Sequence, residues 1–151
     1  NLAGAGPGRT VLDPMCGTGG LLLEAGLVGG SLLGFDAQSK MVRGTRDNLA
    51  AFLDGAHAVG LADATRLPLR DGSVDVVLFD APYGRQSKIA GAGGDDLLAG
   101  ALVEARRVAD RGCFVADRPA TDLARAAGWT VADRYERRVH RSLTRHVHVL
   151  G

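Results

Sequence analysis

Short apolar runs alternate with helical patterns over residues 1–128, and this alternation limits the fold more than any other feature of the sequence. Apolar runs bounded by turn signals predict buried strands, and apolar residues at helical spacing predict the helices between them. The strands are expected at 10–12, 31–35, 56–61, 74–79 and 113–116, and the helices at 18–27, 38–53, 95–109 and 120–127. We therefore predict five βα units, an order typical of a parallel sheet with helices on both faces.

The apolar residues of three helices predict which helix faces are buried. They are Leu21, Leu22, Ala25 and Val28 of the first helix; Met41, Val42, Leu49 and Phe52 of the second; and Leu98, Leu102, Ala105 and Val108 of the third.

The pattern changes after Gly128, where residues 129–139 and 143–150 read as two long strands with alternating faces. Only the short polar turn His140-Arg141-Ser142 separates them, so they are expected to form a hairpin without a crossover helix. Residues 1–151 are thus expected to form one α/β domain with a doubly wound, mostly parallel seven-stranded sheet that ends in an antiparallel hairpin.

The composition is that of a globular domain without a membrane span. At 151 residues the chain can bury one core, and no apolar run approaches the roughly 20 residues that span a bilayer. The start at Asn1, without a basic and then apolar leader, predicts no signal peptide and a sequence cut from a larger polypeptide. Cys16 and Cys113 are too few for a structural zinc site, which favours free thiols in a reducing cytoplasm.

The charge is unevenly distributed although the whole chain carries only +1. Residues 129–151 hold five arginines against Asp133 and Glu136, whereas residues 1–128 hold 13 basic and 15 acidic residues. A basic C-terminal end fits a polyanionic partner, and it also fits a solvated edge strand.

A glycine-rich loop, "DPMCGTGG" from Asp13 to Gly20, follows the first predicted strand. Glycines between a strand and a helix let a ligand approach the backbone and leave helix N–H groups able to bind it. The dinucleotide pattern would need glycine at Leu22, and the Gly-Lys-Ser/Thr of a P-loop is absent. The loop therefore suits a ligand other than NAD or ATP, or is simply a tight turn.

Acidic residues end three successive predicted strands. Asp36 is placed to accept the hydroxyls of a ribose, and Asp63 to accept an adenine amino group. Asp80 ends the fourth strand in "LFDAPYG", residues 78–84, where a carboxylate, a proline and Tyr83 stand together. Each acid alone is more often a cap or turn residue, but the set predicts a pocket for an adenosine with a non-phosphate tail.

The segment after this motif is expected to be a mobile loop, Gly84 to Gly94, beside the carboxyl ends of the strands. Its cations Arg85 and Lys88 are candidates for contacts to phosphate, although exposed loop cations usually bind nothing specific.

The motifs "DPMCGTGG", "GFD", "DAT" and "DAPYG" resemble those of class I S-adenosylmethionine-dependent methyltransferases that methylate amino groups. The longer segments "DPMCGTGGLLLEAGLVG", "DAQSKMVRGTRDNL", "DAPYGRQS" and "HRSLTRHVHVL" are similar to the archaeal tRNA guanosine-10 N2-methyltransferases and their eukaryotic relatives. The resemblance implies a Rossmann-like methyltransferase fold, S-adenosyl-L-methionine as cofactor, tRNA as substrate and a THUMP-type RNA-binding module upstream in the same polypeptide.

The same resemblance implies two sets of site residues. The cofactor-binding set is Asp13, Cys16, Gly17, Thr18, Gly19, Asp36, Ala37, Asp63, Ala64 and Asp80, and the catalytic set is Asp80, Ala81, Pro82 and Tyr83. Asp80 and the Ala81 carbonyl would accept the two hydrogens of a guanine amine, and Tyr83 would stack on the base. Ala81 stands where the family usually has proline, which makes this turn less rigid.

Other functions remain open at this point. The fourth motif also suits DNA adenine or cytosine amines, rRNA guanine and a protein glutamine amide, and a degenerate adenosyl-binding or RNA-tethering module is a non-enzymatic alternative. His140, His146 and His148 suggest a metal, but no carboxylate or cysteine partner is evident, so a solvated or sheet-packed role is favoured. Nothing near Cys16 indicates a covalent nucleophile. The sequence decides neither the number of methyl groups transferred nor the oligomeric state.

Overall fold

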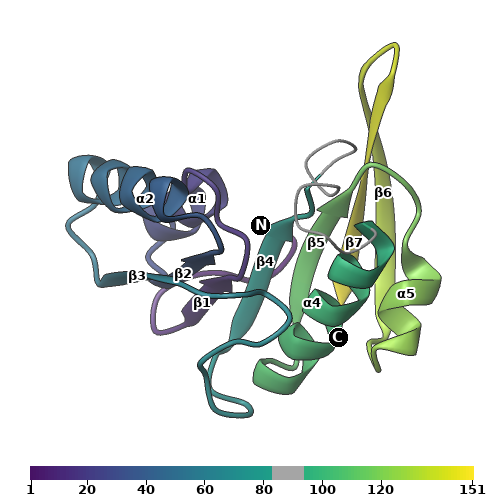
Figure 1. Ribbon diagram of the computed structural model, residues 1–151, viewed down its shortest axis with the longest axis horizontal. Helices are drawn as coiled ribbons and strands as arrows, with labels where there is room; N and C mark the ends of the chain where they lie inside the picture. The colour runs from purple at the N-terminus through teal and green to yellow at the C-terminus, as the bar shows by residue number, and fades with distance from the viewer. Residues whose placement is uncertain (83–93) are drawn as a thin grey trace.

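The computed structural model describes residues 1–82 and 94–151 and shows a seven-stranded sheet with helices on both faces (Figure 1). The strands are β1 Thr10–Asp13, β2 Ser31–Asp36, β3 His57–Leu61, β4 Val76–Asp80, β5 Gly112–Ala116, β6 Val131–His140 and β7 Leu143–Leu150. The helices in the described residues are α1 Gly20–Leu27, α2 Ser39–Phe52, α4 Gly94–Val108 and α5 Thr121–Ala126. None of these helices is both long and apolar enough to cross a membrane.

The strand order is β3-β2-β1-β4-β5-β7-β6, with β1 to β5 parallel and β7 antiparallel to β5. The predicted doubly wound sheet with an antiparallel C-terminal hairpin is therefore confirmed. The order reverses between β1 and β4, and open α/β sheets bind ligands where this reversal meets the carboxyl ends of the strands. Asp13 and Asp80, the last residues of β1 and β4, flank that point.

Two apolar clusters hold the helices against opposite faces of the sheet. On one face, α4 and α5 pack over the centre of the sheet, where Phe79 and Phe114 are fully buried and stacked at 5.5 Å. On the other face, α1 and α2 pack against Val11, Leu32 and Val76. Consecutive residues of one strand serve different clusters because side chains alternate across a sheet.

Most of the residues predicted to face inward are buried. The prediction is wrong for Phe52 and Val28, whose exposed fractions are 67% and 46%. Phe52 is the last residue of α2, and the chain leaves the helix in an extended conformation at Leu53. Leu53 then packs against the second cluster in place of Phe52. Val28 lies one residue beyond the end of α1, where the helical spacing no longer applies.

The connection from β3 to β4 contains no helix, so these two strands do not form a βα unit; the helices expected from the sequence likewise include none between residues 61 and 74. Residues 62–75 form turns and one isolated bridge between Asp63 and Arg66. Arg107 of α4 fixes this segment by donating to the carbonyls of Leu67 and Leu69. These hydrogen bonds satisfy backbone groups that a helix would otherwise have paired.

The hairpin formed by β6 and β7 extends past the rest of the sheet (Figure 1). β5 pairs with β7 only from His146 to Leu150, so the residues of β7 before His146 pair with β6 alone. Almost every residue of β6 is exposed. Since β7 is antiparallel to β5, the tip of the hairpin rises from the carboxyl edge of the parallel strands.

Candidate active site

The loop between β1 and α1 requires glycine at two positions. Gly17 and Gly19 have φ angles of 54° and 87°, in the left-handed region that other residues rarely adopt. A Cβ added to Gly19 would lie 2.9 Å from Cγ2 of Thr45, whereas no atom of the described residues lies within 4 Å of a Cβ added to Gly17. Among these residues there is therefore space beside Gly17 for a ligand to approach, while Gly19 is held against α2.

Asp36 ties the end of β2 to this loop. The Gly17 N–H donates to its Oδ2 at 3.0 Å, and the Gln38 N–H donates to its Oδ1 at 2.9 Å. A carboxylate offers about four lone-pair sites, so Asp36 keeps the capacity to accept ribose hydroxyls. The structure thus brings Asp36 and the glycine loop together, as the sequence predicts.

Two residues of α2 that the sequence reasoning missed also hold the loop. The Thr45 hydroxyl donates to the Gly17 carbonyl at 2.7 Å, and the Asn48 amide donates to the Thr18 carbonyl at 2.8 Å. Thr45 is fully buried on the same face as Val42 and Leu49. A polar residue at an apolar helical position was the signal that could have found it.

Two predicted cofactor residues, Asp13 and Cys16, are buried beneath the loop. Burial raises the pKa of Asp13 to about 8, opposed by the hydrogen bond from the Met15 N–H and increased further by the charges of Asp80 and Asp36. Burial likewise raises the pKa of the Cys16 thiol to about 12. Burial thus favours the neutral form of both side chains, and their position beneath the loop lets them support it.

Asp63 lies two residues beyond the end of β3, so it is in the following turn and does not end the strand itself. Its Oδ1 accepts hydrogen bonds from the Thr65 N–H and hydroxyl, both at 2.8 Å. Asp63 is exposed, and the next residue, Ala64, is buried. Because β2 and β3 are parallel neighbours, Asp63 lies at the same edge of the sheet as Asp36 and the exposed Ala37.

Asp80, at the end of β4, forms an ion pair that the sequence reasoning did not predict. Nη2 of Arg145, in β7, donates to Oδ2 of Asp80 at 2.9 Å. The Arg145 side chain is 43% exposed and the Asp80 side chain 31%, so the pair is accessible to a substrate. Ala81 is buried, and its N–H donates to the Val115 carbonyl, which anchors the turn to β5.

The rest of the predicted catalytic motif is only partly described. Pro82 is half-buried, whereas Tyr83 lies outside the described residues. So do Arg85, Lys88 and the predicted loop from Gly84, except for Gly94, which begins α4. The roles of Tyr83 and the two cations stay predictions.

The histidines serve the hairpin and its base. His148 is fully buried, stacks on Phe114 at 4.3 Å, and accepts a hydrogen bond from the Ala120 N–H at the start of α5. His146 lies 3.4 Å from Glu136. In the ranges 1–82 and 94–151, no three His, Cys, Asp or Glu residues are grouped to hold a metal. The sheet-packed role is therefore confirmed for His148.

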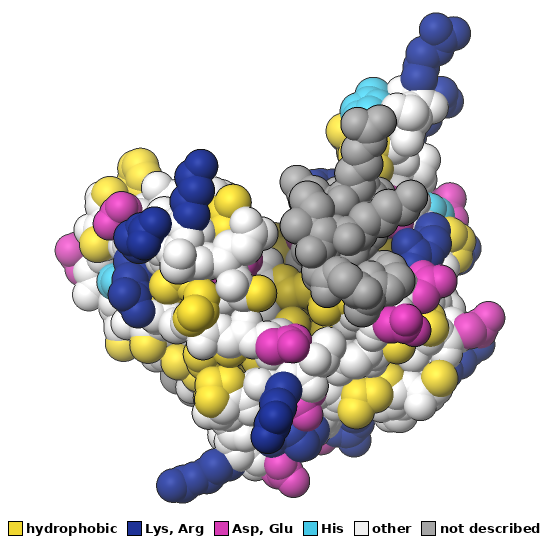
Figure 2. Space-filling model, viewed as in Figure 1, with side chains coloured by type: hydrophobic (Ala, Val, Ile, Leu, Met, Phe, Trp, Pro, Cys, Tyr) yellow, Lys and Arg dark blue, Asp and Glu magenta, His cyan; other side chains and the backbone are white. Residues whose placement is uncertain are grey.

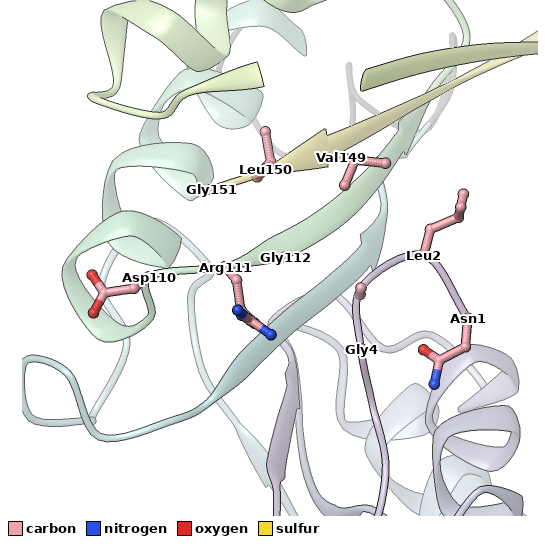
Figure 3. Close-up of a pocket in the computed structure, with 10 residues that line it drawn as sticks. Asn1, Leu2, Gly4, Asp110, Arg111, Gly112, Val149, Leu150 and Gly151 are labelled. Atoms are coloured by element: carbon pink, nitrogen blue, oxygen red, sulfur yellow. The ribbon is translucent and has the colours of Figure 1, made fainter. Parts of the chain in front are cut away.

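A cavity of about 400 Å³ lies near the amino end of β5, away from the carboxyl ends of the parallel strands (Figure 3). Its lining comes from both ends of the chain and from the start of β5: Asn1 to Gly4, Asp110 to Gly112, and Val149 to Gly151. Gly112 is the first residue of β5, whereas Asp80 is the last residue of the parallel strand β4. This cavity is therefore separate from the acids at the carboxyl edge.

The sequence matches a family described as "RMKL-like, methyltransferase domain" over residues 1–147. It is also 38% identical over 154 residues to the tRNA (guanine(10)-N2)-dimethyltransferase of Methanothermobacter thermautotrophicus. That alignment covers 99% of the chain and 46% of the relative. The chain thus spans less than half the length of the first curated relatives that it matches.

Solved structures share the fold. TrmN from Thermus thermophilus superposes with a TM-score of 0.78 and 27% identity, over 99% of this chain and 45% of that one. The magnesium protoporphyrin IX methyltransferase of Synechocystis, solved with bound SAM, has a TM-score of 0.71 and 18% identity, over 99% of this chain and 71% of that one. The sheet that carries Asp36 and Asp80 is therefore a fold shared with methyltransferases.

Proposed function

The chain belongs to the RMKL-like methyltransferase domain family, and from this membership we propose that it transfers a methyl group from S-adenosyl-L-methionine to the exocyclic N2 amine of a guanosine in tRNA. The observation that carries the proposal is the position of Asp80-Ala81-Pro82 at the end of β4, next to β1 and its glycine loop. The relative from Methanothermobacter supports nucleotide 10 as the target.

The described residues at the carboxyl edge fit the cofactor. Within the described residues, no side chain caps the first N–H groups of α1, and there is free space beside Gly17, which suits the carboxylate of an amino-acid tail. Asp36 would hold the ribose, and Asp63 would hold the adenine amine. When bound, the cofactor supplies an electrophilic methyl group on its sulfonium.

Asp80 and the Ala81 carbonyl are proposed to prepare the amine. The guanine N2 lone pair is delocalised into the base, so the amine is a poor nucleophile. If Asp80 and the Ala81 carbonyl each accept one of its hydrogens, the nitrogen becomes pyramidal and its lone pair turns away from the base plane. Tyr83 would stack on the extruded base, a contact worth about 1–3 kcal/mol. The residues therefore act mainly by positioning.

Arg145 is proposed as a positioning residue for Asp80. Its hydrogen bond occupies Oδ2 of Asp80, which fixes the carboxylate and directs its remaining lone pairs. The guanidinium does not lose its proton, so it remains a charged hydrogen-bond donor to Asp80.

Capture of the tRNA is proposed to involve a THUMP-type module in the same polypeptide. Relatives such as that of Methanothermobacter are more than twice as long as their aligned part, which leaves room for such a module. A cytoplasmic setting belongs to the same proposal, since Cys16 and Cys113 are free thiols.

The experiment that tests the proposal is transfer of label from tritiated S-adenosylmethionine to pools of tRNA, DNA and protein, followed by nucleoside analysis. We expect label in N2-methylated guanosine from tRNA and in no other product. Label in methyladenine, methylcytosine or methylglutamine would replace the proposed substrate with the corresponding alternative. Mass analysis of the nucleoside would also distinguish one added methyl group from two.

A further inference from the structure

Residues 134–145 of the β6–β7 hairpin are basic, and most of them are exposed. They contain all five arginines of the last 23 residues of the chain and a single acid, Glu136. Figure 2 shows Lys and Arg side chains at the tip of this projection, well above the body of the molecule. We call these residues the basic arm.

Three arginines of the basic arm lack an acidic partner within the described residues. Glu136 pairs with Arg134 and contacts His146, and Arg145 pairs with Asp80. No ion pair in the described ranges involves Arg137, Arg138 or Arg141, and all three are exposed. The concentrated positive charge of the arm is therefore not neutralised within that part of the chain.

The ladder places one of the three arginines that lack an acidic partner, Arg137, directly opposite Arg145 of β7. Arg137 is the cross-strand partner of Arg145, so their side chains share one face of the hairpin. Like charges directly opposite each other destabilise a β-ladder; Asp80 already pairs with Arg145, and a further anion beside Arg137 would offset the rest of that cost. Arg145 also touches Asp80, so the cationic face leads from the arm to the proposed catalytic carboxylate.

Resting on the proposed function, we propose that the basic arm binds the phosphate backbone of the RNA substrate and holds it next to Asp80. Arg137, Arg138 and Arg141 supply the phosphate contacts. Such contacts set the position and register of a nucleic acid and carry no base specificity, which leaves base selection to the site around Asp80.

The test compares two variants of the 151-residue chain that lose the same charge. The first is Arg137→Gln/Arg138→Gln/Arg141→Gln. The matched control is Arg9→Gln/Arg70→Gln/Arg111→Gln, three arginines for which no side-chain ion pair or hydrogen bond occurs within the described residues. The control sites lie toward the amino ends of the strands: Arg9 precedes β1, Arg111 precedes β5, and Arg70 is in the turn before β4. Thermal unfolding confirms that both variants fold.

Binding of unmodified tRNA is measured without cofactor by fluorescence anisotropy at several salt concentrations. We expect the arm variant to bind at least about 10-fold more weakly at low salt, and its slope of log K against log salt to fall by roughly 2 to 3, since each lost phosphate contact removes about 0.7–0.9. The control should stay within about two-fold of wild type, because phosphate contacts act at short range under screening salt.

Equal losses in both variants, or no loss in the arm variant, would overturn the proposal. Competition by polyglutamate as strong as that by poly(U) at equal charge would also overturn it, because the arm would then bind polyanions in general. Since cofactor is absent from the binding assay, its outcome is separate from that of the methyl-transfer assay. A wild-type chain that binds RNA through the arm but methylates no guanosine would refute the proposed function alone.

Discussion

The cofactor side and the substrate side of the proposed site are held together in different ways. On the cofactor side, Asp36 is fixed by backbone N–H groups of Gly17 and Gln38, which lie 19 and 2 residues away. On the substrate side, Asp80 is fixed by the side chain of Arg145, which lies 65 residues away. The first arrangement depends on one βα unit and its neighbour, whereas the second depends on the insertion of β7 beside β5. Binding of the cofactor and positioning of the substrate should therefore fail separately.

The largest expected effect comes from Asp80→Ala. Asp80 is proposed to touch the amine mainly as it becomes pyramidal, so the single-turnover rate of methyl transfer should fall by about 100- to 1000-fold. Binding of S-adenosylhomocysteine should stay within a few-fold of wild type. Asp54→Ala, at an exposed site, is the control. A wild-type rate for Asp80→Ala would reduce the motif to a strand end and a turn.

Asp36→Ala should give the opposite result. The substitution would remove the two proposed hydrogen bonds from a charged acceptor to ribose, each worth about 1.5–3 kcal/mol, so affinity for S-adenosylhomocysteine should fall by about 3 kcal/mol or roughly 150-fold. Calorimetric titration measures the change, with the exposed Asp47→Ala as control. At saturating cofactor the methylation rate should recover most of its wild-type value, and failure to recover would mean that the two sides are not separate.

Arg145→Gln should have a smaller effect, limited to the substrate side. Loss of the ion pair lets the Asp80 carboxylate rotate, and we expect roughly a 10-fold lower single-turnover rate with unchanged cofactor affinity. Arg145→Lys should restore part of the rate because it keeps a charged donor. If the two variants were equally slow and both bound cofactor weakly, Arg145 would have only a structural role.

The smallest effect is expected from His148→Phe, at the base of the hairpin. Burial, with the nearby charges of Arg134 and His146, lowers the pKa of His148 below its usual 6.5. The neutral imidazole therefore stabilises the fold above pH 6.5, and this contribution is lost as the pH falls through the folded pKa.

Phenylalanine keeps the stacking on Phe114 but leaves the Ala120 N–H without its hydrogen bond, so wild type should be the more stable by about 1 kcal/mol at pH 8. That advantage should shrink by up to about 1.4 kcal/mol per pH unit below pH 6.5. Chemical denaturation of both proteins from pH 5 to 8 measures it. A difference that does not change with pH would show that His148 is not held neutral by the fold.

The sequence predicted what depends on neighbouring residues. The strands, the glycine loop and the acids near the strand ends follow from local apolar patterns and turn residues, so the class of the sheet and the place of Asp36 and Asp80 were predicted. The turn to Leu53 at the end of α2 was not, because helical spacing says nothing of where the chain leaves the helix.

Contacts between distant segments were also missed. The sequence around Arg145 does not predict its ion pair with Asp80. The contact forms only in the folded sheet, where β7 lies two strands away from β4. Thr45 was detectable in principle as a polar residue in an apolar stripe, but its partner, the Gly17 carbonyl, is a backbone group that no sequence pattern marks.

The pairing of the outer hairpin also makes its length adjustable. The residues before His146 in β7 pair only with β6. A cross-strand residue pair can therefore be added to or removed from this part of the hairpin without disturbing the parallel strands. Each residue in a strand advances the tip by about 3.3 Å, and only even steps keep the same side chains on the same face. The distance to which the hairpin tip projects can therefore change in increments of about 6.6 Å, and the length of the two strands alone sets it. A homologous domain with two residues more or fewer in each strand would reach a different point on its partner from an unchanged sheet.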